Sequence, residues 1–118
     1  MAARKIGLMG LGRIGRNLLR ILNDTPRGQE IEIVAVSDIA DHEALAYLVR
    51  FDSLLGRFPA AVQLADGALT VGSRTIRMLS GEKPGDVDWG ALGVETVVEA
   101  TSKFRSRAEH ERHLERGA

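Results

Sequence analysis

The chain has no cysteine among its 118 residues. This absence excludes disulfide bridges, thiolate metal sites and a cysteine nucleophile within the sequence. Whatever chemistry the chain supports must therefore come from other side chains, from the backbone or from a bound group.

Long apolar runs and runs of like charge are also absent. No stretch approaches the ~18 apolar residues of a membrane-spanning helix, and the N-terminus lacks the apolar segment of a signal peptide. The 16 basic and 16 acidic residues give a formal net charge of zero. These features argue against a membrane or nucleic-acid partner and predict a cytoplasmic protein.

The length of the chain predicts a single domain spanning residues 1–118. A chain of this size buries roughly two-thirds of its unfolded surface, which is enough for a core. The sequence shows no internal repeat, low-complexity tract or linker.

Strand and helix patterns alternate along the chain and predict an α/β fold with a mainly parallel sheet of the Rossmann type, flanking helices and a small antiparallel insert. Asp66-Gly67 and Gly72-Ser73 are typical of the tight turns of such an insert. The predicted strands are Lys5–Met9, Ile31–Asp38 and Val94–Thr101, and the insert comprises Ala60–Val71 and Ser73–Ser80. Phe51–Phe58 is expected to be irregular, and Gly81–Gly93 to be a loop with at most one helical turn.

Three helices are predicted from their periodicity and end signals: one from Arg13 to a breaker cluster at Asn23–Gly28, one over His42–Arg50 and one over Ser106–Ala118. In the last helix, Ser106 and Glu109 have the spacing of a capping box, and Gly117 is expected to end the helix. In the first helix, the apolar positions are Ile14, Leu18, Leu19 and Leu22, and Arg16, Asn17 and Arg20 are expected on the opposite face.

The stretch Gly10-Leu-Gly12-Arg-Ile-Gly15 matches the pattern G-x-G-x-x-G. Three glycines alone carry little information, but this match follows a predicted strand and opens a predicted helix. Asp38 then follows at the end of the next strand, close to the ~20-residue spacing of dinucleotide-binding folds. Together these features predict a dinucleotide site, whereas the alternative is a tight turn without a ligand.

Each part of the motif has a physical role in such a site. Gly10 permits the sharp turn, Gly12 lets the backbone approach a pyrophosphate, and Gly15 lets helix and strand pack closely. The backbone N–H groups of Arg13 and Ile14 are expected to point at the phosphates, assisted by the helix dipole. Asp38 is expected to accept hydrogen bonds from a ribose and to repel a 2′-phosphate, which favours NAD over NADP.

Several ordered blocks resemble the N-terminal part of glyceraldehyde-3-phosphate dehydrogenase. They are the glycine turn with "RIGR", "FDSLLGRF" (Phe51–Phe58), "WGALGVETVVEAT" (Trp89–Thr101) and "HLERGA" (His113–Ala118). The resemblance runs across essentially the whole chain and implies an NAD-dependent, phosphorylating aldehyde dehydrogenase of glycolysis, usually a homotetramer. By position, it implies that Thr101 and Phe104 line the adenine and nicotinamide-ribose side of the site, and that Glu82 stands near adenine.

The chain departs from the family pattern at several positions. The usual Asn-Gly-Phe-Gly turn is Met9-Gly10-Leu11-Gly12, so the polar contacts of the asparagine are lost. Glu82 stands where the family has arginine, Ser102 where it has glycine, and Leu55 where it has histidine. The dinucleotide site is nevertheless expected to be intact.

The chemistry that the resemblance implies needs a cysteine to form a thiohemiacetal and a histidine to take the thiol proton. In the family these residues lie beyond the stretch that this chain matches. We therefore expect a chain that binds cofactor without turning over substrate, belongs with a C-terminal catalytic domain, and leaves a sheet edge unpaired. This interpretation makes it a truncated form, a split-gene product or an excised domain.

Two other functions are left open by the sequence. An erythrose-4-phosphate dehydrogenase has similar N-terminal blocks, although Asp38 favours the first interpretation. A free-standing, non-catalytic nucleotide-binding module also fits the missing cysteine.

Other chemistry-bearing residues are expected to be structural. His110 and His113 share a helix face without an obvious third metal ligand, so a solvated face is expected there. Asp52 and Ser53 are expected to shape a turn, and Trp89 to pack in the core.

Overall fold

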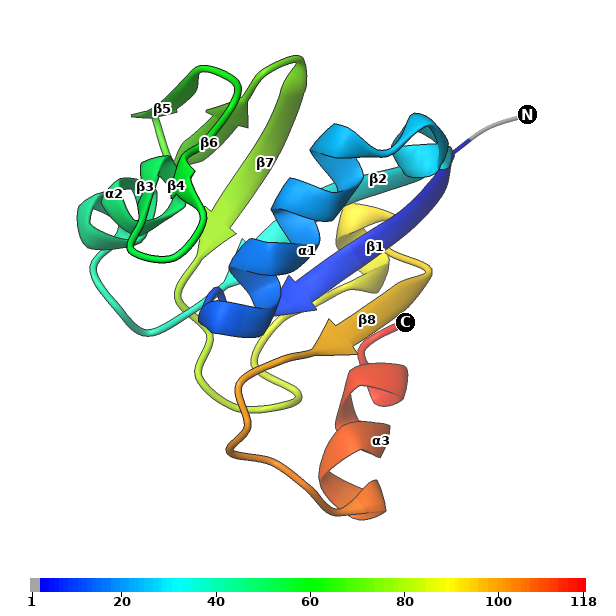
Figure 1. The fold of residues 1–118 in the computed structure, drawn as a ribbon. Coiled ribbons are helices and arrows are strands. Elements are labelled where there is room, and N and C mark those ends of the chain that lie inside the picture. The colour runs from blue at the N-terminus through cyan, green and yellow to red at the C-terminus, as the bar shows by residue number, and fades with distance from the viewer. Residues whose placement is uncertain (1–2) are drawn as a thin grey trace.

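One sheet organises the computed structural model, which describes residues 3–118 (Figure 1). Within these residues the sheet has six strands in the order β5-β6-β7-β2-β1-β8. The strands are β1 (Arg4–Met9), β2 (Ile31–Ser37), β5 (Val62–Ala65), β6 (Ala68–Val71), β7 (Arg74–Leu79) and β8 (Thr96–Glu99).

The sheet is parallel on one side and antiparallel on the other. Strand β1 pairs in parallel with both β2 and β8, and β2 pairs in parallel with β7. Strands β5, β6 and β7 form an antiparallel meander. The predicted Rossmann-type α/β fold with a small antiparallel insert is therefore confirmed.

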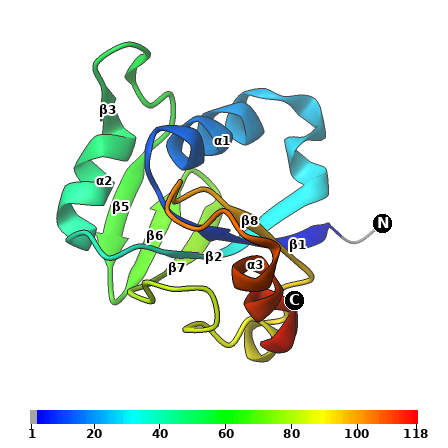
Figure 2. The same ribbon diagram turned by 90° about the horizontal axis from the view of Figure 1, so that it is seen from below.

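Helices cover both faces of the sheet. The helices are α1 (Arg13–Asp24), α2 (His42–Arg50) and α3 (Arg107–Glu115), and two short 3₁₀ segments are η1 (Pro26–Glu30) and η2 (Gly90–Leu92). Figure 2 shows α1 on one face and α3 on the other. This arrangement is typical of a parallel sheet whose strands are buried on both sides.

The two faces bury separate apolar clusters. Leu8, Ile33 and Val36 of the sheet pack with Leu19 of α1 and Val49 of α2 in the larger cluster. The smaller cluster on the opposite face contains Met9, Ala35, Val87, Trp89 and Val94. Alternation along β1 explains this division, because successive side chains of a strand point to opposite faces. In β2 the register shifts between Ile33 and Ala35, so Val34 and Ala35 both belong to the smaller cluster and Val36 lies with the larger one.

Trp89 is the largest fully buried side chain, at 0% exposure, which confirms its predicted packing role. Its ring fills the space over Gly7 of β1, where an added Cβ would stand 2.3 Å from Cζ3 of the indole. The missing side chain at Gly7 is therefore what lets the indole lie on the sheet.

Most of the predicted elements are confirmed. The three strands predicted outside the insert, all three predicted helices and the single helical turn near Gly90 are present. Asp66 and Gly67 both have positive φ, at 53° and 74°, as a two-residue hairpin turn of type I′ requires. Ser106 and Glu109 form the predicted capping box, and Gly117 follows the last helix with φ of 99°.

Three expectations about local structure are wrong. The stretch Phe51–Phe58 is not irregular, because β3 (Phe51–Asp52) pairs with β4 (Gly56–Arg57) in a short hairpin. Ile14 is 63% exposed, whereas Arg20 is buried. The strand predicted over Val94–Thr101 was expected to be buried, but β8 is only half-buried, since it forms the edge of the sheet.

The β3-β4 hairpin explains why Arg20 is buried. Its guanidinium donates a hydrogen bond of 2.6 Å to the carbonyl of Gly56 and lies 5.2 Å from the centre of the Phe58 ring. The hairpin thus covers the polar side of α1 that the periodicity assigned to solvent.

Within residues 3–118, none of the helices combines the length and apolar character needed to span a membrane.

Replacing Gly7 with alanine tests the packing of Trp89. The added methyl group would collide with the indole, so Gly7→Ala is expected to lower the free energy of unfolding by about 1–3 kcal/mol. Urea denaturation followed by the fluorescence of Trp89, the single tryptophan, measures this change. Gly12→Ala is the control, because an added Cβ there has no atom within 4 Å. An unchanged midpoint for Gly7→Ala would contradict the packing described here.

Candidate functional site

The carboxyl ends of three parallel strands meet at one small cavity. Met9 stands beside both Ser37 and Glu99 in the sheet, so the chain leaves all three strands at the same edge. The chain moves outward from β1 toward β2 and β7 and later returns to place β8 on the other side of β1. Such a switch point is where open parallel sheets bind ligands.

The cavity has a volume of about 120 Å³ and draws its walls from all of these strand ends. It is lined by Gly10, Gly12, Ser37, Asp38, Ile39, Gly81, Glu82, Ala100, Thr101 and Lys103.

Two glycines of the motif are required by the fold itself. Gly10 has φ of 97°, and its N–H donates to the carbonyl of Ser37 at 2.8 Å. A Cβ at Gly10 would stand 2.9 Å from the backbone nitrogen of Thr101. A Cβ at Gly15 would stand 2.5 Å from the carbonyl oxygen of Gly10. These two positions therefore let α1 approach the end of β1 and let β8 approach the turn.

Gly12 differs from the other two because the protein itself has room for a side chain there. Its φ of −82° suits any residue, and an added Cβ would have no atom within 4 Å. Gly12 is also the N-cap of α1, where it offers no side chain to the unpaired N–H groups of the first turn. The helix thus presents backbone donors and a positive dipole end beside open space.

Asp38 is held rigidly beside the glycine turn. Its Oδ2 accepts the N–H of Leu11 at 2.8 Å, and its Oδ1 accepts the N–H of Ala40 at 2.9 Å. Each carboxylate oxygen keeps further acceptor capacity. The cavity therefore contains a fixed, negatively charged acceptor.

Glu82 is placed by the loop that follows β7. The buried hydroxyl of Ser37 donates to the carbonyl of Gly81 at 2.8 Å and ties this loop to β2. Asp86 accepts the N–H groups of Lys83 and Glu82 at 2.8 and 3.1 Å. The backbone N–H of Lys83 is the main cause that lowers the pKa of Asp86, so this carboxylate stays charged and keeps both bonds to the loop backbone.

Thr101 and Ser102 form the wall that follows β8. The N–H and hydroxyl of Thr101 donate to Oε2 of Glu99 at 3.1 and 2.7 Å. Ser102 has φ of 64°, in the left-handed region that favours glycine. Ser102 thus adopts a backbone conformation that costs a residue with a Cβ about 1–2 kcal/mol.

Five of the nine residues that the sequence assigns to the site line this cavity: Gly10, Gly12, Asp38, Glu82 and Thr101. Gly15 packs against the carbonyl of Gly10 and does not line the cavity. Arg13 and Ile14 begin α1 beside Gly12 without lining the cavity. Phe104 lies outside it, on a loop where its carbonyl accepts a hydrogen bond from His110 at 2.7 Å.

The side chain of Arg13 forms an ion pair with the buried carboxylate of Asp52. Asp52 also accepts the N–H groups of Leu54 and Leu55 at 2.8 and 2.9 Å, which confirms its predicted place in a turn. These backbone bonds, with a smaller contribution from Arg13, lower the pKa of Asp52 from 3.8 to about 2. The start of α1 is therefore tied to the β3-β4 hairpin.

The sequence reasoning missed the other lining residues. Ser37, Gly81 and Ala100 all lie at or just beyond the carboxyl ends of strands, so the predicted strand ends were a usable signal. Ile39 lies two residues beyond β2 and Lys103 four residues beyond β8, in loops where no pattern distinguishes them.

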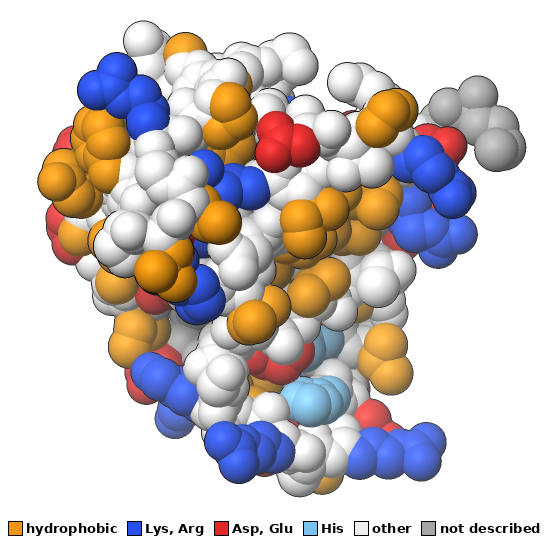
Figure 3. Space-filling view, in the orientation of Figure 1, with side chains coloured by type: hydrophobic (Ala, Val, Ile, Leu, Met, Phe, Trp, Pro, Cys, Tyr) orange, Lys and Arg blue, Asp and Glu red, His pale blue; other side chains and the backbone are white. Residues whose placement is uncertain are grey.

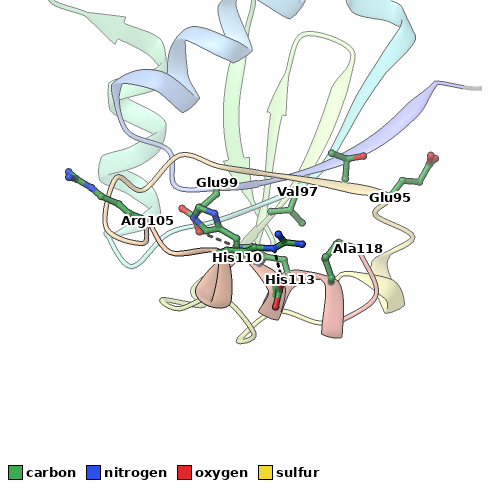
Figure 4. A pocket seen from close by; sticks show the side chains of 11 residues that line it. Glu95, Val97, Glu99, Arg105, His110, His113 and Ala118 are labelled. Carbon is green, nitrogen blue, oxygen red and sulfur yellow. Dashed lines mark hydrogen bonds and ion pairs between the residues drawn. The ribbon is translucent and has the colours of Figure 1, made fainter.

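A larger cavity of about 680 Å³ lies between β8 and α3 (Figure 4). His110 and His113 line it together with Glu99 and other side chains. The expectation of a solvated histidine face is wrong for His113, which is 4% exposed and bonded to Trp89 and Glu99. Within the described part of the chain, no group of three potential metal ligands comes together.

Comparisons with known proteins identify relatives of this chain. Residues 4–107 match the family described as glyceraldehyde 3-phosphate dehydrogenase, NAD binding domain. Glyceraldehyde-3-phosphate dehydrogenase 1 of Streptomyces arenae is 46% identical over 114 residues, which cover 97% of this chain and 34% of that protein. Glyceraldehyde-3-phosphate dehydrogenase 1 of Bacillus subtilis is 42% identical over 116 residues, which cover 98% of this chain and 34% of that protein.

The similarity extends beyond bacteria. The cytosolic glyceraldehyde-3-phosphate dehydrogenase of Leishmania mexicana is 40% identical over 114 residues, or 97% of this chain and 34% of that protein. The chain thus spans about a third of the length of these relatives.

The low pKa of Asp52 predicts how acid weakens the link between α1 and the hairpin. Because the pKa in the folded state lies below its ordinary value, this carboxylate stabilises the fold above about pH 4. That stabilisation is lost as the pH falls toward 2. Asp52→Asn is therefore expected to be less stable than the wild type at pH 7 and to show a shallower acid limb. Urea midpoints measured between pH 7 and pH 2 test this, and parallel curves over the whole range would contradict it.

Proposed function

The chain belongs to the glyceraldehyde-3-phosphate dehydrogenase family, whose NAD-binding domain its sequence matches, and we propose that the cavity at the ends of β1, β2 and β8 is its NAD site. The observation that carries this proposal is the open space at Gly12, at the N-terminus of α1. The fold itself would accept a side chain at Gly12, so the glycine there is explained by a ligand that occupies the space beside it.

The start of α1 suits the pyrophosphate. The backbone N–H groups of Arg13 and Ile14 belong to the first turn, which lacks intrahelical acceptors for them. A pyrophosphate accepts these bonds and is further stabilised by the helix dipole. The side chain of Arg13 is already paired with Asp52, so the contact proposed for Arg13 is made by its backbone.

Asp38 suits the ribose of the adenosine half. Its two oxygens are oriented by Leu11 and Ala40 and can accept bonds from ribose hydroxyls. A 2′-phosphate at the same place would meet a fixed negative charge. We therefore propose that the site prefers NAD to NADP.

Glu82 and Thr101 line the same cavity, and we propose that both contact the adenosine half. Phe104 lies farther along the loop, so its proposed contact with the cofactor is the least supported of the nine. Gly10 and Gly15 act by shaping the turn.

For the whole protein we propose the NAD-dependent, phosphorylating oxidation of an aldehyde, with NAD as the acceptor of the hydride. The chain itself has no cysteine to form a thiohemiacetal. We propose that residues 1–118 supply cofactor binding and that a C-terminal domain supplies the catalytic cysteine and histidine. Relatives about three times as long support this division. Their shared name favours glyceraldehyde 3-phosphate over erythrose 4-phosphate and over a free-standing module.

We further propose that the whole protein is a homotetramer. Apolar side chains lie exposed on the face that carries α1 and the β3-β4 hairpin (Figure 3). Ile14, Ile21, Leu54 and Leu55 are each more than half exposed. Contact with neighbouring subunits would bury such side chains.

Gly12→Ala tests the pyrophosphate contact. The substitution is expected to leave the free energy of unfolding within about 0.5 kcal/mol of the wild type, because the protein has room for the methyl group. The same methyl group would occupy the space proposed for the pyrophosphate and weaken NAD binding by roughly tenfold or more, about 1.4 kcal/mol. Thermal melts with and without NAD measure both quantities, since saturation at 100 times Kd adds about 2.7 kcal/mol to the wild type.

The matched control is Gly15→Ala, which should destabilise the fold even without NAD because of its contact with Gly10. If Gly12→Ala binds NAD as tightly as the wild type, the pyrophosphate does not lie at this turn.

Asp38→Ala tests the ribose contact. The loss of charged hydrogen bonds is expected to cost about 1.5–3 kcal/mol of NAD binding, roughly a 10- to 100-fold loss in affinity. Calorimetric titration with NAD and with NADP measures this change. The preference for NAD should narrow in the variant, and equal affinity of the wild type for both cofactors would remove the role given to Asp38.

A further inference from the structure

A continuous chain of hydrogen bonds runs from the buried Trp89 to Thr101 at the edge of the NAD cavity. The indole Nε1–H of Trp89 donates to Nδ1 of His113 at 3.1 Å. Nε2–H of His113 donates to Oε1 of Glu99 at 3.1 Å. Oε2 of Glu99 accepts both the N–H and the hydroxyl of Thr101. Figure 4 shows Glu99 and His113 together at the wall of the larger cavity.

The direction of every bond in this chain follows from its first donor. An indole N–H can only donate, so Nδ1 of His113 must be unprotonated and the proton of the neutral ring lies on Nε2. That proton points to Glu99. Trp89 is 0% exposed and His113 is 4% exposed, so water does not compete for these bonds.

The same logic fixes what Thr101 offers to the cavity. Its hydroxyl proton is used by Glu99, and Oγ1 already accepts the N–H of Lys103 at 3.2 Å. A threonine hydroxyl has one donor and two acceptor positions. The hydroxyl oxygen of Thr101 can therefore accept one further hydrogen bond, and Thr101 lines the cavity.

We propose that Trp89, His113 and Glu99 are positioning residues that hold Thr101 as a hydrogen-bond acceptor for a donor group on the adenosine half of NAD. The inference rests on the proposed function, because Asp38, which is assigned to the adenosine ribose, lines the same cavity. His113 belongs to α3, whereas Thr101 follows β8, so the chain of bonds couples the packing of α3 to the affinity for the cofactor.

Glu99→Gln breaks the relay with little change in shape. The amide has only one acceptor oxygen, so it cannot accept from both His113 and Thr101. When its NH₂ group faces Thr101, the hydroxyl must turn and present its proton to the cavity. NAD affinity is expected to fall about 3- to 10-fold, measured by calorimetry. Glu111→Gln is the matched control, because Glu111 forms an exposed ion pair with Arg107 and should bind NAD as the wild type does.

A double-mutant cycle distinguishes positioning from general destabilisation. In a Thr101→Val background, Glu99→Gln should cause no further loss of NAD affinity, because the acceptor it positions is gone. Thr101→Ser should keep the affinity of the wild type. In addition, the indole N–H resonance of Trp89, the single tryptophan, should shift when NAD is added to the wild type and stay unchanged in Thr101→Val.

Each outcome decides between the proposals. Equal NAD affinity of Glu99→Gln and the wild type, or additive losses in the cycle, overturns the relay and leaves the NAD site in place. A wild-type chain that does not bind NAD overturns both. If Glu99→Gln does not fold, the half-buried Thr101 still provides the test: loss in Thr101→Val without rescue by Thr101→Ser overturns the relay.

Discussion

The pairing of β1 on both of its edges, between β2 and the edge strand β8, is the constraint on which the rest of the structure depends. Because β1 pairs with β2 on one edge and β8 on the other, the turn after Met9 is flanked by the ends of both neighbours. The backbone at Gly10 must then fit between Ser37 and Thr101, which leaves no room for a side chain. The cavity, its acidic residue and its threonine all follow from this one pairing.

The sequence predicted those parts of the fold whose signals are local. The hairpin at Asp66-Gly67 needed only two residues with positive φ, and the capping box at Ser106 needed only the spacing to Glu109. The glycine turn and Asp38 were also found this way, because each lies at the end of a strand with a clear apolar pattern. Five of the nine residues assigned to the site do line one cavity.

The remaining features depend on contacts between segments far apart in the chain. Arg20 is buried because a hairpin 36 residues away supplies a carbonyl and a ring, which periodicity within α1 does not reveal. His113 is buried because Trp89 and Glu99 both meet it across the face of the sheet. In each case a long-range polar partner overrides the pattern of the local sequence.

Ser102 gives the cavity wall a property that a glycine would lack. Its left-handed φ of 64° is held while Thr101, its neighbour, is bonded on both its N–H and its hydroxyl. A glycine would adopt this φ freely, whereas a serine prefers a negative φ. The bonds that Thr101 makes to Glu99 therefore hold Ser102 against its own preference. The shape of the wall thus depends on Glu99, because loss of those bonds would let the backbone at Ser102 relax.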